Sequence, residues 1–230
     1  DWSSDVCSSD LHVHVFGPVA RFPYSDSRSF TPVEAPKEKL FALHQLMGID
    51  RCVIVQSMIH GLDNAVVADA IAAGQGCYLG VALVPVDISS DALRGLANQG
   101  FRAVRFNFMK HLGVGANPEA LVELTRRLAE HHMHLQVHFD PGLIDDLSPW
   151  LKRSAVPVVI DHMARVDATQ GIQDHAFQAL CRLLDNKRFH VKVSGIDRVN
   201  EKLPLDNPPY PLGIKLAAYL VSRSEEHTSE

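Results

Sequence analysis

The sequence is poor in cysteine and has no apolar run long enough to cross a membrane. Its four cysteines include no Cys-x-x-Cys pair, the spacing on which zinc ribbons and thioredoxin-type redox sites depend. We therefore expect reduced, buried thiols and a cytoplasmic setting rather than a disulfide framework. A membrane-spanning helix needs about 20 consecutive apolar residues, so we expect no membrane association.

Both ends of the chain read as translations of one sequencing-adapter DNA in its two orientations. The segments are DWSSDVCSSD at residues 1–10 and RSEEHTSE at residues 223–230. We expect both to be adapter-derived scars that carry no fold information. Residues 11–222 are then expected to form one domain, truncated and open at both ends.

An excess of one charge is also lacking once these ends are set aside. The whole chain has a formal charge of −5, but its end segments hold six acidic residues and one arginine, which leaves 21 acidic and 21 basic residues. Nucleic-acid-binding domains carry a clear basic excess. We therefore expect no nucleic-acid partner.

Apolar runs suited to buried parallel strands alternate with stretches of helical spacing. This alternation, with short connections, predicts an α/β fold with a parallel sheet. The predicted strands are residues 11–16, 51–56, 78–84, 103–108, 134–139, 158–162 and 189–193. The predicted helices are residues 37–47, 64–73, 90–98, 118–132, 141–154, 171–186 and 211–221.

Two architectures fit this alternation: an open doubly wound sheet and a closed (β/α)8 TIM barrel. The first strand is not followed by Gly-x-Gly-x-x-Gly, so the fingerprint of a dinucleotide-binding sheet is missing. Polar residues stand at the carboxyl ends of several predicted strands, as in barrel enzymes. We therefore predict an incomplete TIM barrel of about seven βα units, with the eighth strand missing where the adapter-derived segment begins.

Histidines form the first candidate site. His12 and His14 alternate along the first strand and are expected to project to one face, either a functional face or simply the solvated one. His138 and His162 end the fifth and sixth predicted strands. Neutral imidazoles from several strands suit zinc, manganese or a similar divalent ion, but they can also donate hydrogen bonds to an oxyanion without a metal. The sequence leaves this choice open.

Arginines form the second candidate site. Arg105 lies inside the fourth predicted strand, where an unpaired cation is costly, while Arg165 and Arg198 follow the sixth and seventh strands. Guanidinium groups match carboxylates in a bidentate geometry. They therefore indicate a small carboxylated substrate, with salt bridges at the bases of loops as the alternative. Asn107 and Ser194 add polar groups at the ends of the fourth and seventh strands.

Several motifs resemble the amidohydrolase-related family (amidohydrolase 2) that includes 2-pyrone-4,6-dicarboxylate lactonase. They are HVHVFGP at residues 12–18, RFPY at 21–24, FTP at 30–32, FNFM at 106–109, DHMAR at 161–165 and VSG at 193–195. The resemblance covers nearly all of residues 11–222. It implies a distorted TIM barrel that opens a lactone, a cyclic ester.

The resemblance also implies roles for individual residues. His12, His14 and His162 polarise the carbonyl, and an aspartate on the eighth strand activates water. Arg105, Arg165 and Arg198 bind the substrate carboxylates. From their places at strand ends, Asn107, His138 and Ser194 are also expected to bind substrate. The family opens with Asp-x-His-x-His; Asp10 matches this aspartate but lies in the adapter-derived segment, so we interpret the match as coincidence.

Two alternatives to a lactone hydrolase stay open. One is a metal-dependent decarboxylase or amidase of the same superfamily, with His12, His14, His138 and His162 as metal ligands. The other is a non-catalytic barrel that binds small molecules. Because the eighth strand is expected to be missing, we expect no meaningful turnover from these 230 residues; the sequence predicts no oligomeric state.

Overall fold

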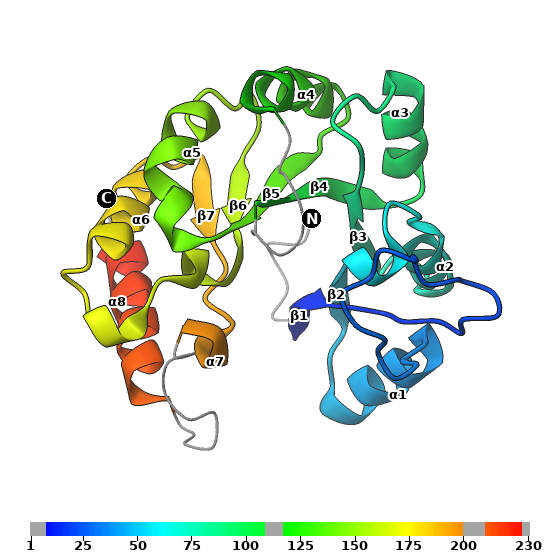
Figure 1. Cartoon of the computed structure of the whole chain (residues 1–230). Helices are drawn as coiled ribbons and strands as arrows, with labels where there is room; N and C mark the ends of the chain where they lie inside the picture. The colour runs from blue at the N-terminus through cyan, green and yellow to red at the C-terminus, as the bar shows by residue number, and fades with distance from the viewer. Residues whose placement is uncertain (1–7, 109–116, 200–209, 227–230) are drawn as a thin grey trace. The chain divides into compact units, whose positions relative to one another are not determined.

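Parallel strands and helices alternate along the chain (Figure 1). The computed structural model describes residues 8–108, 117–199 and 210–226. In this part of the chain seven strands follow one another across the sheet in sequence order. They are β1 (Ser9–Val13), β2 (Arg51–Val55), β3 (Tyr78–Leu83), β4 (Phe101–Phe108), β5 (His134–Phe139), β6 (Val158–Ile160) and β7 (Phe189–Val191).

Helices occupy the connections between these strands. Short 3-10 turns are η1 (Met58–His60), η3 (Pro141–Leu143), η4 (Asp161–Arg165) and η5 (Ala168–Gln170). The α-helices are α1 (Lys37–Met47), α2 (Ala65–Ala73), α3 (Ser90–Asn98), α4 (Pro118–Glu130), α5 (Ile144–Leu151), α6 (His175–Leu184), α7 (Ile196–Val199) and α8 (Pro211–Glu226). This parallel β/α order confirms the predicted fold class and is that of the first seven units of a TIM barrel.

The chain divides into two compact units. Unit 1 comprises Asp1–Arg105 and Arg127–Met133, and unit 2 comprises Phe106–Arg126 and His134–Glu230. In unit 1, β2 pairs with both β1 and β3, and β3 pairs with β4, all in parallel. In unit 2, β6 pairs in parallel with both β5 and β7. The candidate residues are therefore best followed one unit at a time.

Local capping explains where several helices begin. The side chain of Asn117 accepts a hydrogen bond from the backbone N–H of Glu119 at 2.9 Å, so Asn117 caps the start of α4 before Pro118. Ser89 caps α3 and Asp174 caps α6 through their side-chain oxygens in the same way. These caps satisfy amide groups that the first turn of a helix leaves without partners.

Buried apolar side chains of the strands form the core of each unit. In unit 1, Ile54, Ala82 and Val104 are fully buried on successive strands. In unit 2, Val137 and Ile160 are equally buried on adjacent strands. Near-continuous apolar strands are typical of parallel sheets covered on both faces. No helix in the described ranges is long and apolar enough to cross a membrane.

Two expectations need correction. The sixth strand ends at Ile160 rather than at His162, because the backbone turns into left-handed conformations from residue 162. Of the three free thiols described, those of Cys52 and Cys181 are buried as expected, but Cys77 is exposed.

Candidate active site

The His-x-His pair lies at the carboxyl end of β1 in unit 1. His12 is in the strand and His14 follows its last residue. Their ring centroids are 5.1 Å apart and the rings are perpendicular. A register shift between Asp10 and Val13, where β1 meets β2, marks a bulge. The two imidazoles are neighbours, as the alternation predicts.

The neighbouring strand fixes the orientation of His14. Its Nδ1 lies 2.7 Å from the carbonyl oxygen of Val55, the last residue of β2. A carbonyl oxygen only accepts hydrogen bonds, so Nδ1–H of His14 is the donor. In the neutral ring, Nε2 then carries a lone pair, which suits a metal ion. Donation from Nε2 to a substrate oxygen requires the doubly protonated ring.

His60 was not among the predicted site residues, yet it is part of the same region. It is buried, its Nδ1–H donates to the carbonyl of Pro23 at 3.1 Å, and its ring stacks 6.4 Å from that of Phe16. Burial lowers the pKa of His60 below 6.5, which favours the neutral ring. Its Nε2 has no hydrogen-bond partner among the described residues. A His-Gly pair after a buried strand was the only sequence signal.

A second histidine pair lies in unit 2. His138 near the end of β5 and His162 in η4 are both buried. Their ring centroids are 5.5 Å apart, with the rings nearly perpendicular. The Nδ1 of His162 lies 2.9 Å from Oγ of Ser194, which follows β7. Three predicted site residues, one from each of three successive strand ends, are therefore brought together.

His162 stands on a strained turn. The φ angles of residues 162–165 lie between 50° and 54°, which is left-handed, and none of the four residues is glycine. Such residues each cost of the order of 1 kcal/mol and persist only where the surroundings hold them. Gly195 packs against this turn so closely that an added Cβ would lie 3.1 Å from Cβ of His162. The turn and Gly195 together set the position of the imidazole.

A buried polar network surrounds Asp161, the residue directly before the left-handed residues of this turn. Gln136 on β5 donates to Oδ2 of Asp161 at 2.9 Å, and Nζ of Lys192 donates to Oε1 of Gln136 at 3.0 Å. Nζ of Lys192 also lies 3.5 Å from Oδ1 of Asp161, whose side chain is fully buried. Lys192 was not among the residues predicted from the sequence. The only signal for it is a lysine within an otherwise apolar strand end. The network joins three strand ends of unit 2.

The predicted substrate-binding residues divide between the units. Arg105 is buried on β4 in unit 1, where its strand partner is Leu83. Asn107 is half-buried on the part of β4 in unit 2, and its Oδ1 has no hydrogen-bond partner among the described residues. Arg165 is half-buried in η4 and Arg198 is exposed on α7. The units thus bring together His12 with His14, and His138 with His162 and Ser194.

The donor sets fit a divalent metal ion. Imidazole nitrogens suit zinc and related ions. The backbone bond at Nδ1 of His14 is the kind of outer contact that orients a metal-ligating histidine. In unit 1 His12 and His14 offer such nitrogens, and in unit 2 His138 and His162 offer them.

Parallel β/α units with paired histidines at or near the carboxyl ends of their strands are typical of a TIM-barrel enzyme. The chain belongs to the amidohydrolase family, whose model, described as Amidohydrolase, matches residues 9–223. The family predicted from the sequence motifs is thereby confirmed, and with it the hydrolase class.

Named relatives are hydrolases of lactones. The chain is 33% identical over 206 residues to a 4-sulfomuconolactone hydrolase of Hydrogenophaga intermedia, covering 89% of this chain and 68% of that protein. It is 35% identical over 192 residues to a 2-pyrone-4,6-dicarboxylate hydrolase of Comamonas testosteroni, covering 83% and 63%. The chain thus spans about two thirds of the length of these curated relatives.

A solved structure of a similar protein supports the same family and fold. It is a probable 2-pyrone-4,6-dicarboxylic acid hydrolase of Acinetobacter baumannii with citric acid bound. It superposes with a TM-score of 0.80 at 26% identity, covering 96% of this chain and 79% of that one.

Proposed function

We propose that this chain is the carbonyl-polarising part of a lactone hydrolase acting on a small substrate with carboxylate groups. The observation that carries the proposal is the His12–His14 pair, with Nδ1 of His14 fixed on the Val55 carbonyl, in a chain whose relatives are lactone hydrolases. We assign the electrophilic role to His12, His14 and His162. We place the natural domain at residues 11–222, between adapter-derived ends, and in the cytoplasm.

The relatives support the substrate class. Pyrone dicarboxylate carries two carboxylates, sulfomuconolactone carries acidic groups, and citric acid carries three carboxyl groups. Arginine is the side chain best suited to bind carboxylates in a bidentate geometry. We assign carboxylate binding to Arg105, Arg165 and Arg198. Asn107, His138 and Ser194 complete the proposed substrate contacts.

The reaction is the addition of water across an ester bond. The water oxygen bonds to the carbonyl carbon, the ring C–O bond breaks, and the ring oxygen leaves with a proton. A base takes the proton of the attacking water, and negative charge develops on the carbonyl oxygen. Hydrogen-bond donors aimed at this oxygen typically accelerate such steps about 10²–10³-fold each. The three histidines are proposed to act there, and His14 donates from Nε2 as the doubly protonated ring.

Asp161 is poorly suited to be the base. Its carboxylate is fully buried, accepts from Gln136 and lies beside Lys192. A carboxylate without solvent-exposed surface is poorly placed to take a proton from an attacking water. The family resemblance implies an aspartate on an eighth strand as the base, and the described residues contain no eighth strand.

A bound divalent ion would supply a Lewis acid and lower the pKa of a bound water. His12, His14, His138 and His162 are the residues that would hold it. The alternative of a metal-dependent decarboxylase or amidase requires this set with His138 as a ligand, whereas the proposed lactone hydrolase does not require a metal ion. Metal analysis of the purified protein, with His138→Ala as the variant, separates the two: loss of a tightly bound metal in the variant favours the alternative.

Calorimetric titration with 2-pyrone-4,6-dicarboxylate tests the substrate class directly. We expect binding of the dicarboxylate, no binding of unsubstituted 2-pyrone, and an affinity at least about tenfold lower in Arg105→Gln, because a charged hydrogen bond is worth about 1.5–3 kcal/mol. Arg102→Gln is the matched control, since Arg102 is exposed on the same strand and donates to the carbonyls of Ala97 and Phe101. Equal binding of both pyrones would contradict the proposal.

The hydrolytic step can be tested separately, from the sequence of the gene. The proposal requires a carboxylate on the eighth strand that the family resemblance implies, and the sequence of the gene tests this directly. A gene without a carboxylate there, together with dicarboxylate binding, would indicate the non-catalytic binding barrel instead.

A further inference from the structure

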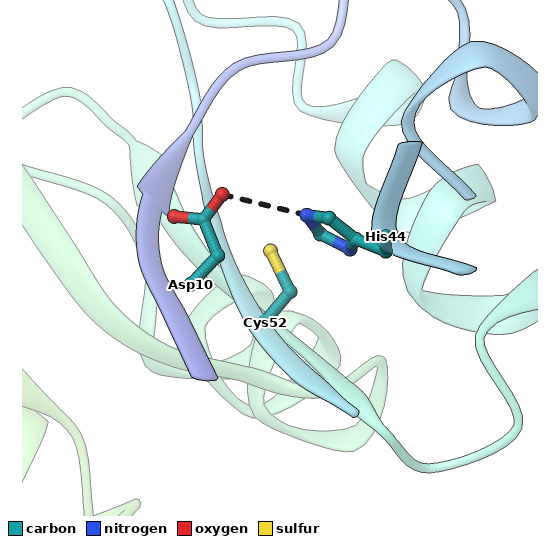
Figure 2. A group of neighbouring side chains, drawn as sticks. All are labelled: Asp10, His44 and Cys52. Atoms are coloured by element: carbon teal, nitrogen blue, oxygen red, sulfur yellow. Dashed lines mark hydrogen bonds and ion pairs between the residues drawn. The ribbon is translucent and has the colours of Figure 1, made fainter. Parts of the chain in front are cut away.

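A second cluster of metal-ligating side chains lies at the amino ends of β1 and β2, at the opposite ends of these strands from His14. Its members are Asp10 on β1, His44 on α1 and Cys52 on β2 (Figure 2). Their ligand atoms, a carboxylate oxygen, an imidazole nitrogen and a sulfur, all lie within 4.8 Å of one another. We propose that Asp10, His44 and Cys52 bind one zinc-type divalent ion in unit 1.

The strand register explains how two of the three ligands meet. Asp10 and Cys52 are direct partners in the parallel pairing of β1 with β2, so their side chains lie side by side on one face of the sheet. Figure 2 shows the sulfur of Cys52 beside the gap between the Asp10 carboxylate and the His44 imidazole. Helix α1 brings His44 onto this face, where it is buried.

The separation of the Asp10 and His44 ligand atoms fits a tetrahedral ion. Ligands about 2.0–2.2 Å from a tetrahedral zinc lie roughly 3.3–3.6 Å from one another. Nε2 of His44 and Oδ2 of Asp10 are 3.4 Å apart, which is long for a hydrogen bond between nitrogen and oxygen. A cation between the two atoms would satisfy both at the separation they already have.

Neighbouring groups orient both of these ligands. Oδ1 of Asp10 accepts the backbone N–H of His12 at 3.1 Å, which directs Oδ2 toward His44. Nδ1 of His44 lies 2.9 Å from the hydroxyl of Tyr78. A hydroxyl both donates and accepts, so His44 can present a lone pair at Nε2 while Nδ1–H remains bonded. Such outer contacts are characteristic of metal-ligating histidines.

Charge and access are also suitable. A thiolate and a carboxylate together balance the two charges of the ion. The Cys52 side chain is fully buried, and its thiol would release a proton when the sulfur binds the ion. The Asp10 side chain is 30% exposed, which gives the ion a way in. Sulfur, nitrogen and oxygen donors favour zinc over magnesium or calcium.

Cobalt is the probe for this site, because Co²⁺ replaces zinc and a bound thiolate gives a near-ultraviolet charge-transfer band. We expect the band to saturate at one Co²⁺ per chain and to disappear when Zn²⁺ is added. Cys52→Ser should abolish it. Cys77→Ser is the matched control and should leave it unchanged, since Cys77 is exposed and outside the cluster. His14→Asn should also leave it unchanged, which separates this site from the histidine pairs.

Two further measurements test the site even if Cys52→Ser does not fold. X-ray absorption of the zinc-loaded full chain should show one sulfur neighbour, and a shell of nitrogen and oxygen alone would overturn the proposal. His44→Gln should weaken cobalt binding at least about tenfold. Absence of the band in the unaltered chain, or its survival in Cys52→Ser, would equally overturn it.

Asp10 belongs to the segment expected to be adapter-derived, so the site is proposed for the chain as it stands. Asp10→Ala measures how much the carboxylate contributes to the affinity for cobalt. We expect at least about tenfold weaker cobalt binding, with the charge-transfer band retained at saturation. Unchanged affinity would remove Asp10 from the ligand set and overturn the site as proposed.

Discussion

The two histidine pairs are held in different ways. In unit 1, His14 is fixed by the backbone, through the carbonyl of Val55. In unit 2, His162 is fixed by side chains and a strained turn: Ser194 at its ring, Gly195 against its Cβ, and the Asp161 network at its base. A backbone contact survives most substitutions, whereas a side-chain framework can be dismantled one residue at a time. The second pair is therefore expected to be far more sensitive to its neighbours.

Lys192→Met is expected to cause the largest decrease in the free energy of unfolding. This change removes the Lys192 cation that lies beside the fully buried Asp161 carboxylate, and breaking a buried pair costs about 3–5 kcal/mol. Urea unfolding measures the loss. The control is Lys187→Met, because Lys187 is exposed in the same unit.

The double variant Asp161→Asn, Lys192→Met sharpens this test. Removing both charges is expected to recover a large part of the lost stability, since the cost arises from the uncompensated carboxylate. A Lys192→Met chain within about 1 kcal/mol of the unaltered protein would show that the network does not support the turn.

Gly195→Ala is expected to have the next largest effect. Gly195 has φ of +67° and would place its new Cβ about as close to the His162 ring as to its Cβ, at 3.1–3.2 Å. A non-glycine residue with this backbone costs about 1–3 kcal/mol, and the contact displaces His162. Urea unfolding and the NMR signals of the His162 ring measure the two effects. Gly142→Ala is the control, since its Cβ meets nothing within 4 Å, and equal behaviour of the two variants would contradict the role of Gly195.

His14→Phe is expected to cost less stability than either change in unit 2. It removes one hydrogen bond to a backbone carbonyl, which contributes about 0.5–1.5 kcal/mol. The unfolding free energy, compared with that of the exposed control His175→Phe, measures this difference. A loss larger than that of Gly195→Ala would reverse the comparison between the pairs.

The smallest expected effect is on the pH dependence of folding stability, and it arises from His60 in unit 1. Burial lowers the pKa of His60 in the folded protein below 6.5, so the unfolded chain binds more protons as the pH falls. The stabilisation from the neutral ring is therefore present above pH 6.5 and is lost as the pH falls through 6.5 toward the folded pKa. Urea midpoints measured between about pH 8 and pH 5 should fall less in His60→Asn, which keeps a donor for the Pro23 carbonyl. Identical pH profiles would contradict the shift.

Much of the fold was predictable because it depends on local patterns. The helix over residues 37–47 and the strand over 134–139 match their predicted bounds, since each has a clear period and a clear stop such as Gly48, which ends α1. Apolar periodicity says little about where a short strand ends. It failed at His162, where left-handed residues without glycine form a turn that no local propensity favours.

The candidate site was predictable where it rests on strand ends. The proximity of His12 to His14 follows from strand alternation, and the histidines of unit 2 meet because neighbouring parallel strands end at one edge. Lys192, Gln136 and His60 were missed because their importance arises from partners distant in sequence. The Asp10, His44 and Cys52 cluster is similar, since only the pairing of β1 with β2 and the packing of α1 bring its members together.

The most direct test of the proposed function is NMR of the imidazole nitrogens during titration with 2-pyrone-4,6-dicarboxylate, because it requires no turnover. The account predicts that the ring signals of both His14 and His162 shift and saturate with the ligand, while those of His44 and the exposed His175 do not. Saturable binding that leaves the His14 and His162 rings unchanged would contradict the assignment of these histidines to the substrate carbonyl.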